Sequence, residues 1–524
     1  MNLGVLYKQY TSLSGVKAAV FVVCLGALSA LALPFFYGLP LLFLTFPLLV
    51  VRLNRCTCGK QAFAQGYWFG FGFHSAGLYW LINAILIRAH DFWWLVPIVS
   101  PLCAILLAFW TGLVGLGFYL LNPRKKNNIV LFAGLWTLCD MSRGLVVPAQ
   151  WWNPLLTGFP WNPLGSCWEY PGQLGNLLIQ PASLMGVDGL TFFIVLLALT
   201  PLLKYKGLIV FCITLGFWCS FSFIRLASAP LANSKTPIVA LVQGNIAEDD
   251  KINNTDPRRI FQKYLELTIK GVDLAKKEQL LQRTPNRPIV FVWPESAFPG
   301  DIEYDAIARE ILMQNNPEAS YGILGAVTQK DRDKIYNSLV VLNSKGASIA
   351  KEYHKSKLVP FGEMQPWYVP FHVVPGISLT PGYGNETFSL PSLASFAPLI
   401  CYEIIFSGQI IKSGHRPKWV LNVTNDAWYG NSAGPYQHLA ASRLRAVEEG
   451  LPVVRVANTG ISAVFDPYGR ELSRIKWGEE NTIAVPLPGA LPPTLFSVGG
   501  RYIPVMLSIL SILVGFMWSR KTAK

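Results

Sequence analysis

Charged side chains are scarce in this chain of 524 residues. Asp, Glu, Lys and Arg together make up 14% of the sequence, whereas about a quarter is usual in soluble proteins. Hydrophobic residues make up 52%. The shortage of charge is concentrated in residues 18–227, while residues 233–488 have the composition of a soluble domain. This uneven deficit argues against a wholly soluble protein and favours a membrane protein that carries one soluble domain.

Cysteine is nearly absent from the soluble stretch, which contains only Cys401 and therefore cannot form an internal disulfide. The other eight cysteines lie in apolar stretches or their loops: Cys24, Cys56, Cys58, Cys103, Cys139, Cys167, Cys212 and Cys219. The spacing of Cys56-Thr57-Cys58 is not that of a zinc or redox pair. The sequence shows no ligand cluster and no phosphate-binding loop, so we expect the protein to need neither a metal nor another cofactor.

A dense basic stripe is also lacking, although the formal net charge is +14. Nucleic-acid-binding domains concentrate Lys and Arg on one face, often with aromatic residues among them. The basic residues of this chain are instead distributed over the loops between apolar stretches. We therefore expect no nucleic-acid partner and attribute the positive charge to membrane topology.

Eight apolar stretches approach or exceed the length that crosses a bilayer, and the second is the shortest. They are 18–36, 37–51, 62–87, 92–121, 128–147, 180–203, 207–227 and 503–519. Lys and Arg collect in alternate flanking loops, near residues 8–17, 52–60, 124–126, 204–206 and 520–524. By the positive-inside rule, both termini are expected to be cytoplasmic and the soluble domain to lie on the opposite side.

The expected domains follow from these stretches. They are a transmembrane domain at 1–227 (spans one to seven), a soluble domain at 228–490, and a final span with a cytoplasmic tail at 491–524. The first stretch could be mistaken for a signal peptide, but more apolar sequence follows it at once. We therefore expect an uncleaved span.

The soluble domain alternates strand-like and helix-like segments, which predicts a layered α/β fold. Asp256-Pro257 has the residue order of a helix N-terminus. A second helix is predicted at 434–449. The predicted strands are 237–242, 288–293, 321–327, 338–342, 395–400, 419–423, 452–456, 462–465 and 482–485.

Three places where a strand runs into a loop carry reactive groups: Glu295, Lys355 and Cys401. A buried strand that ends abruptly at a thiol can present it as a nucleophile. The plain alternatives are a small buried thiol, a surface carboxylate at a strand end, and a lysine in a solvated basic cluster. A thiol nucleophile needs a base, and none of His354, His372, His415 and His438 stands in a papain-like context. Glu295 is therefore the better candidate for the base.

The ordered motifs around these residues resemble the Glu-Lys-Cys pattern of the nitrilase (carbon–nitrogen hydrolase) superfamily. They are Trp293-Pro294-Glu295, Lys355 followed by Leu358-Val359-Pro360-Phe361-Gly362-Glu363, and Cys401-Tyr402-Glu403. With the apolar stretches, the chain is similar to the bacterial apolipoprotein N-acyltransferases over nearly its whole length. Further matching motifs begin at Thr157, Val242, Tyr336, Asn425, Gly434 and Asn458.

The resemblance implies a polytopic α-helical membrane domain of about eight transmembrane helices joined to a nitrilase-like αββα sandwich. It implies that Glu295 is the general base, Lys355 stabilises the oxyanion and Cys401 is the nucleophile. The supporting positions are Asn337, Glu363, Tyr402 and Glu403. One departure is Ile252, which stands where the family often has tryptophan.

The implied reaction is the last step of lipoprotein maturation. Cys401 takes an acyl chain from a phospholipid as a thioester and passes it to the N-terminal amine of a diacylglyceryl-modified apolipoprotein. The implied location is the bacterial inner membrane, with the catalytic domain on the periplasmic side. One alternative is a membrane-tethered amidase of the same superfamily. A transporter with a soluble binding domain is disfavoured by the scarcity of charge within the spans.

Three further features have a structural and a functional interpretation. Asp140 and Arg143 lie three residues apart in a predicted span, where mutual neutralisation is favoured over function. Trp151, Trp152, Trp161 and Trp168 suggest an interfacial aromatic belt. The Pro- and aromatic-rich segment 360–375 is predicted to be a lid at the membrane face; the alternative is that its aromatic residues pack on the sheet.

Overall fold

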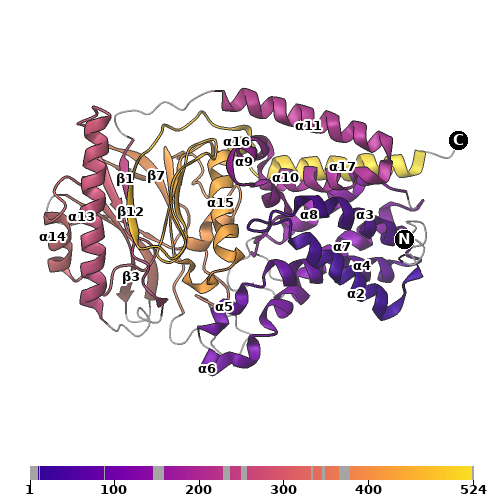
Figure 1. Ribbon diagram of the computed structural model, residues 1–524, viewed down its shortest axis with the longest axis horizontal. Helices are drawn as coiled ribbons and strands as arrows, with labels where there is room; N and C mark the ends of the chain where they lie inside the picture. Colours follow the sequence, from indigo (N-terminus) through magenta and orange to yellow (C-terminus); the bar gives the residue numbers. More distant parts are fainter. Residues whose placement is uncertain are drawn as a thin grey trace. The chain divides into compact units, whose positions relative to one another are not determined.

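The computed structural model divides into two compact units, Met1–Arg225 with Gly499–Lys524, and Leu226–Val498. We call them the membrane unit and the catalytic unit, and describe each by itself (Figure 1). The structure describes residues 10, 12–87, 89–124, 126–145, 158–227, 236–248, 256–331, 334–344, 348–364 and 378–521.

All regular elements among the described residues of the membrane unit are helices. Its α-helices are α2 (Gly15–Ala30), α3 (Leu42–Leu53), α4 (Gly59–Gly77), α5 (Leu81–Leu86), α6 (Ala89–Phe92), α7 (Val99–Leu121), α8 (Ile129–Ser142), α9 (Gly172–Leu178), α10 (Ala182–Ala198), α11 (Tyr205–Leu226) and α17 (Tyr502–Lys521). Short 3-10 turns are η1 (Leu39–Leu41), η2 (Trp93–Leu95), η4 (Leu164–Trp168) and η5 (Thr200–Leu203).

Among the described residues, three helices are long and apolar enough to cross a membrane: Val99–Leu121, Tyr205–Leu226 and Tyr502–Arg520. The pair α9 and α10, bent by 94°, would be a fourth if it forms one span. The apolar helices at Gly15–Ala30, Leu39–Leu53 and Ile129–Ser142 are shorter. The first of these stops before Pro34, because a proline disfavours helix in the residue before it. These helices indicate a membrane protein, and the total of eight spans stays a prediction.

Close backbone contacts hold the membrane unit together. A Cβ atom on Gly66 of α4 would lie 2.3 Å from the Thr111 carbonyl oxygen of α7, and one on Gly72 would lie 1.9 Å from the Val23 carbonyl oxygen of α2. Only glycine permits both approaches. Lipid chains are as apolar as the helices, so this kind of packing, rather than hydrophobic burial, associates helices in a bilayer.

The catalytic unit contains two six-stranded sheets, in the orders β12-β1-β2-β3-β4-β5 and β11-β10-β9-β8-β7-β6. The first-sheet strands in chain order are β1 (Ile238–Gln243), β2 (Ile289–Val292), β3 (Tyr321–Asp331), β4 (Lys334–Asn343), β5 (Ile349–His354) and β12 (Asn481–Pro486). The second-sheet strands are β6 (Phe388–Leu390), β7 (Leu393–Ile400), β8 (Trp419–Thr424), β9 (Val453–Ala457), β10 (Ser462–Phe465) and β11 (Glu471–Ile475). The central strands β1-β2-β3 and β7-β8-β9 are parallel.

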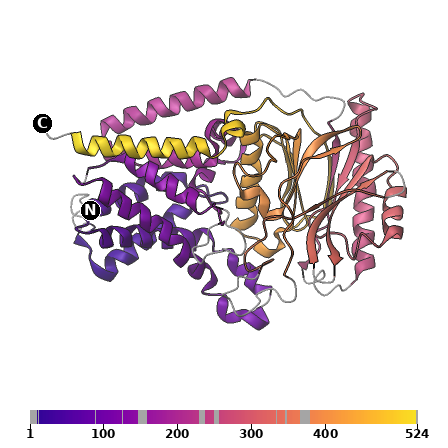
Figure 2. The ribbon, with the colours of Figure 1, turned by 180° about the vertical axis from the view of Figure 1, so that it is seen from behind.

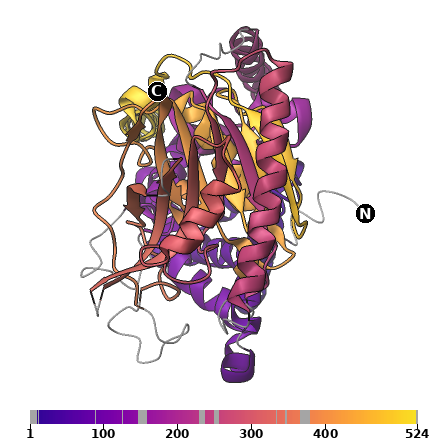
Figure 3. The same cartoon turned by 90° about the vertical axis from the view of Figure 1, so that its left-hand side faces the viewer.

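Helices cover the outer face of each sheet, which gives the αββα sandwich (Figures 1 and 2). On the first sheet these are α13 (Pro257–Leu281) and α14 (Ala306–Gln314), which face the viewer in Figure 3. On the second sheet it is α15 (Ala433–Glu449), and α16 (Leu495–Gly499) follows the last strand. One hydrophobic core lies between the two sheets and another between the first sheet and its helices.

Most predicted elements of this unit are confirmed. The Asp256 side chain accepts a hydrogen bond from Arg259 N at the start of α13, as its sequence position predicts. The helices and strands that sequence analysis missed are α14, α16, β5, β6 and β11. Strand β5 is half exposed and carries charged residues at its centre, so it lacks the continuous apolar run that marks a strand covered on both faces.

Candidate active site

Cys401 occupies a strained turn directly after strand β7. It is the first residue of η6 (Cys401–Ile405), and its φ of +50° lies in the left-handed region. That conformation costs a non-glycine residue roughly 1–2 kcal/mol. Strain of this kind persists only where the surroundings hold it, and it is commonest at functional sites. The residue is 6% exposed, so its thiol sits at the buried end of a strand, as the sequence predicted.

Hydrogen bonds to Glu403 connect this turn to the segment after β5. One of its carboxylate oxygens accepts a hydrogen bond from Ile400 N at 2.8 Å. The other accepts from Ser356 N at 2.8 Å and from the Tyr353 hydroxyl at 2.8 Å. Glu403 is fully buried. It therefore joins the turn that carries the thiol to the segment that carries Lys355.

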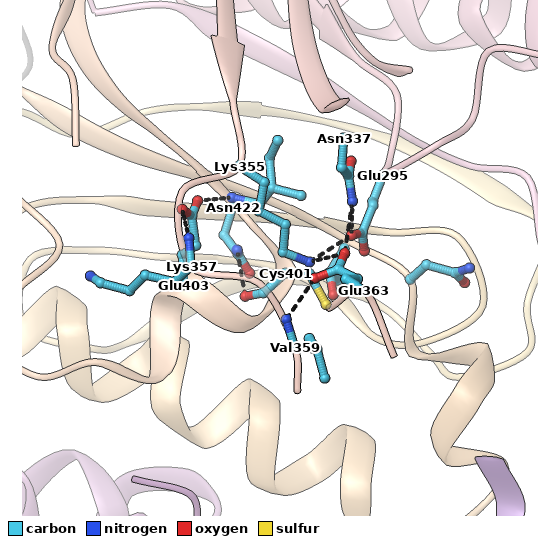
Figure 4. Close-up of polar contacts among 12 residues, drawn as sticks. Glu295, Asn337, Lys355, Lys357, Val359, Glu363, Cys401, Glu403 and Asn422 are labelled. Carbon is cyan, nitrogen blue, oxygen red and sulfur yellow. Dashed lines mark hydrogen bonds and ion pairs between the residues drawn. The ribbon is translucent and has the colours of Figure 1, made fainter. Parts of the chain in front are cut away.

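Lys355 follows β5 and is 1% exposed. Its Nζ lies 2.7 Å from Glu363 Oε1 and 3.2 Å from Glu295 Oε1 (Figure 4). Burial opposes the charge on this ammonium, but the carboxylates of Glu295 and Glu363 outweigh it and raise the pKa of Lys355 well above its ordinary value. Lys355 is therefore a fixed positive charge at neutral pH.

Glu295 stands just beyond β2, and β3 approaches it closely. A Cβ atom on Gly325 of β3 would lie 2.1 Å from the Pro294 carbonyl oxygen, so only glycine allows this approach. Asn337 of β4 donates a hydrogen bond to Glu295 Oε1 at 2.7 Å. Within the described residues, the hydrogen bonds to this carboxylate end on Oε1, which leaves Oε2 able to take a proton.

Glu363 lies in a tight turn that begins at Val359, and its Oε2 accepts a hydrogen bond from Val359 N at 2.8 Å. Asn337 reaches Glu363 Oε1 as well, at 3.2 Å, so one amide bridges both carboxylates. The remaining residues of the predicted lid, 365–375, lie outside the described residues. The same is true of Trp151, Trp152, Thr157 and Ile252.

Burial raises the pKa of the Cys401 thiol, and the nearby Glu295 carboxylate raises it further, while Lys355 acts in the opposite direction. The sulfur lies beside the Lys355, Glu295 and Glu363 side chains in Figure 4. At neutral pH the group is therefore a thiol. It needs a base to become a nucleophile, and the arrangement supplies a carboxylate for that purpose.

The structure brings five of the seven predicted residues together: Glu295, Lys355, Cys401, Asn337 and Glu363. The other two take different positions. Glu403 holds the turn, and the Tyr402 ring makes an edge contact with Phe406 at 5.2 Å between centroids. Among the described residues, no group of three His, Cys, Asp or Glu side chains could hold a metal ion.

Sequence analysis gave His438 no role, but the structure places it against the backbone of Cys401. Its Nε2 lies 3.1 Å from the Cys401 carbonyl oxygen. Asn422 Nδ2 lies 3.2 Å from the same oxygen. The available signal was the Gly434-Pro435-Tyr436-Gln437-His438 motif, whose chemistry cannot be deduced without knowing that α15 packs behind the turn.

Two family models match the chain. Carbon-nitrogen hydrolase matches residues 238–490, and Apolipoprotein N-acyltransferase N-terminal domain matches residues 25–200. An amidase of the nitrilase superfamily from Nesterenkonia AN1 gives a TM-score of 0.35 at 17% identity, over 49% of this chain and 93% of that one.

Full-length relatives match both units together. The apolipoprotein N-acyltransferase of Rhodopseudomonas palustris is 34% identical, over 95% of either chain. That of Bradyrhizobium diazoefficiens is 33% identical, over 97% of this chain and 96% of its own. With two family models and relatives of this similarity and coverage, the chain belongs to the apolipoprotein N-acyltransferase family and has a carbon–nitrogen hydrolase catalytic domain.

Proposed function

We propose that this enzyme transfers an acyl chain from a phospholipid to the N-terminal diacylglyceryl-cysteine amine of apolipoproteins, through a thioester on Cys401. The observation that carries the proposal is the buried thiol on a strained turn beside one ammonium and two carboxylates. The presence of this site in a chain with membrane-spanning helices favours a lipid acyl donor.

In the first half-reaction, Glu295 Oε2 takes the thiol proton as the sulfur attacks the ester carbonyl of the phospholipid. Lys355 stabilises the negative charge that develops on the carbonyl oxygen. When the carbon–oxygen bond breaks, Glu295 returns its proton to the leaving alkoxide, and lysophospholipid departs. The acyl chain is left on Cys401 as a thioester, with no net change in protons.

In the second half-reaction, the α-amino group of the diacylglyceryl-cysteine attacks the thioester carbonyl. Glu295 accepts a proton from the amine, and Lys355 again faces the oxyanion. When the carbon–sulfur bond breaks, Glu295 gives that proton to the leaving thiolate. The products are an amide and a free thiol. Glu363 keeps Lys355 charged and aligned through both halves, since its carboxylate lies nearer to Nζ than that of Glu295.

The membrane setting is part of the proposal. We infer about eight spans, cytoplasmic termini and a periplasmic catalytic domain at residues 228–490, between membrane segments at 1–227 and 491–524; the alternation of basic loops supports this. Moving an acyl chain into water costs about 0.8 kcal/mol per CH₂. Donor and acceptor should therefore reach Cys401 from the outer leaflet of the bacterial inner membrane.

The test is a transfer assay with the full-length protein in lipid nanodiscs that contain an acyl-labelled phospholipid. A peptide with a diacylglyceryl-cysteine at its N-terminus is the acceptor, and its N-acetylated form is the matched control. We expect label on the free-amine peptide alone. Release of labelled fatty acid at the same rate with and without acceptor would instead favour the amidase alternative, in which water is the acceptor.

A further inference from the structure

A charged network lies against the backbone of Cys401, behind the turn that carries the thiol. It consists of Asp426 at the start of η7 (Asp426–Tyr429), His438 of α15 and Arg455 of β9. All three side chains are 0% exposed. Asp426 Oδ1 lies 3.0 Å from His438 Nδ1, and Asp426 Oδ2 lies 2.6 Å from Arg455 Nη2. Together with Asn422, we call these residues the rear network.

The rear network converges on one atom, the carbonyl oxygen of Cys401. His438 Nε2 approaches it to 3.1 Å and Asn422 Nδ2 to 3.2 Å. A carbonyl oxygen can only accept, so His438 Nε2 must carry a proton and donate it. Arg455 in turn donates to Asn422 Oδ1 at 2.9 Å, which fixes the amide so that its NH₂ faces the carbonyl. With Nε2 protonated, Nδ1 of the neutral His438 ring accepts from Arg455 Nη2, which lies 3.2 Å away. Both donors are therefore oriented by the Arg455 guanidinium, which Asp426 holds in turn.

Stability alone gives a poor account of this arrangement. A buried ion pair can often be replaced by apolar side chains of similar volume without loss of stability, because removing charge from water is costly. The residue whose carbonyl oxygen accepts these hydrogen bonds is Cys401, which has a left-handed φ of +50°. A strained residue keeps its conformation only when its surroundings determine it.

We propose that His438 is a positioning residue for acyl transfer, and that Asp426, Arg455 and Asn422 hold it and share its task. The network clamps the Cys401 carbonyl and so maintains the turn that directs Sγ toward Glu295 and Lys355; this rests on the proposed thioester function. The Cys401–Tyr402 peptide is planar, so its N–H points away from the clamped edge. Releasing the carbonyl would rotate that peptide and displace the thiol at the same time.

The experiment measures the rate at which phospholipid alone acylates the full-length protein in nanodiscs, by intact mass. His438→Leu keeps an apolar side chain of moderate size without a donor, and His438→Gln keeps a donor. We expect His438→Leu to acylate about a hundred-fold more slowly at saturating phospholipid, since a displacement near 1 Å can have that effect. The phospholipid concentration for half-maximal rate should not change, and His438→Gln should recover most of the rate.

The control is Ser462→Ala. Ser462 is equally buried, in the sheet that carries Asn422 and Arg455, but it bonds to Gln243 and the Ala457 backbone. Its loss should therefore lower the melting temperature without slowing acylation. A folded His438→Leu protein that acylates at the wild-type rate would overturn the inference, as would equal rates for His438→Leu and His438→Gln. If His438→Leu does not fold, the acylation rate of Asn422→Ser is measured instead. A folded Asn422→Ser protein that acylates at the wild-type rate would then overturn the inference. A wild-type protein that forms no thioester would overturn the proposed function itself.

Discussion

Each unit buries charged side chains, but in different proportions. Within the described part of the membrane unit, Arg143 at the end of α8 pairs with Asp140, at 2.5 and 3.0 Å, and also donates hydrogen bonds to the carbonyl oxygens of Phe159 and Trp161. In the catalytic unit, Lys355 faces two carboxylates, Glu295 and Glu363, beside a thiol. Arg143 and Asp140 together form a neutral set. Lys355, Glu295 and Glu363 form a set with one more negative than positive charge.

The difference separates buried charge that fixes structure from buried charge that serves chemistry. A neutral pair whose donors end on carbonyl oxygens joins α8 to the segment 158–161. The unbalanced set contains a carboxylate that can take a proton from a neighbouring thiol, and an ammonium that is charged before and after that transfer. As predicted from their spacing, Asp140 and Arg143 neutralise each other.

Neutralising Glu295, the proposed general base, is the strongest test of the difference between the two sets of buried charges. Glu295→Gln keeps the shape and the hydrogen bond from Asn337 but cannot accept the thiol proton. General-base catalysis contributes about 10²–10⁴-fold, so thioester formation should fall by that factor. The rate of thioester formation is measured by stopping the reaction at successive times and determining the intact mass of the protein. Thioester formation at close to the wild-type rate would assign the base to another residue.

Removing the ammonium should have the next largest effect. Lys355→Met loses the charge that faces the oxyanion, and loss of one such contact costs about 10²–10³-fold. Two buried carboxylates are then left without their cation, so the melting temperature should fall as well. The variant Lys355→Met/Glu363→Gln, which removes one excess charge, should regain stability but not activity. Recovery of activity in the double variant would contradict the role given to Lys355.

The pH dependence of Cys401 alkylation sharpens the comparison further. Burial, the largest cause of the raised pKa, is unchanged in Glu295→Gln. A raised pKa leaves the thiol protonated, so the thiolate fraction in that variant should rise about tenfold per pH unit between pH 7 and 10, without a plateau. Iodoacetamide labelling followed by peptide mass spectrometry gives the rate. A plateau below pH 9 would mean that the thiol ionises readily without its base.

The smallest effect on chemistry is expected in the membrane unit. Arg143→Met should lower the melting temperature, because Asp140 loses its partner, yet leave the acylation rate per folded molecule within about twofold. Arg143→Met/Asp140→Leu removes both charges and should recover part of the lost stability. A large loss of rate in a folded Arg143→Met protein would give this pair a functional role that its neutral geometry does not suggest.

The candidate site was predictable from sequence to the extent that its motifs are contiguous. Glu295, Lys355 and Cys401 each lie within three residues after the end of a strand, and short motifs mark all three. The pairing of Lys355 with Glu363 was not predictable, because it depends on a turn at residues 359–364 whose geometry no periodic pattern reveals. His438 was out of reach for a similar reason: its partner is a backbone carbonyl, which carries no sequence signal.

In the membrane unit, the apolar pattern located helices better than it located their ends. The predicted stretch 62–87 contains the end of α4 at Gly77 and a separate α5 at Leu81–Leu86. Hydropathy does not register such a break, since apolar residues continue through it. The predicted span 180–203 likewise starts near the 94° bend between α9 and α10, where Pro181 interrupts the helix.

The central claim is that Cys401 carries the acyl chain. The most direct measurement is the intact mass of the full-length protein after incubation with a single phospholipid species and no acceptor, followed by hydroxylamine. We predict an added mass equal to one acyl group, located at Cys401, removed by hydroxylamine and absent from Cys401→Ala. An acyl adduct at another residue, or full transfer activity in Cys401→Ala, would contradict the account.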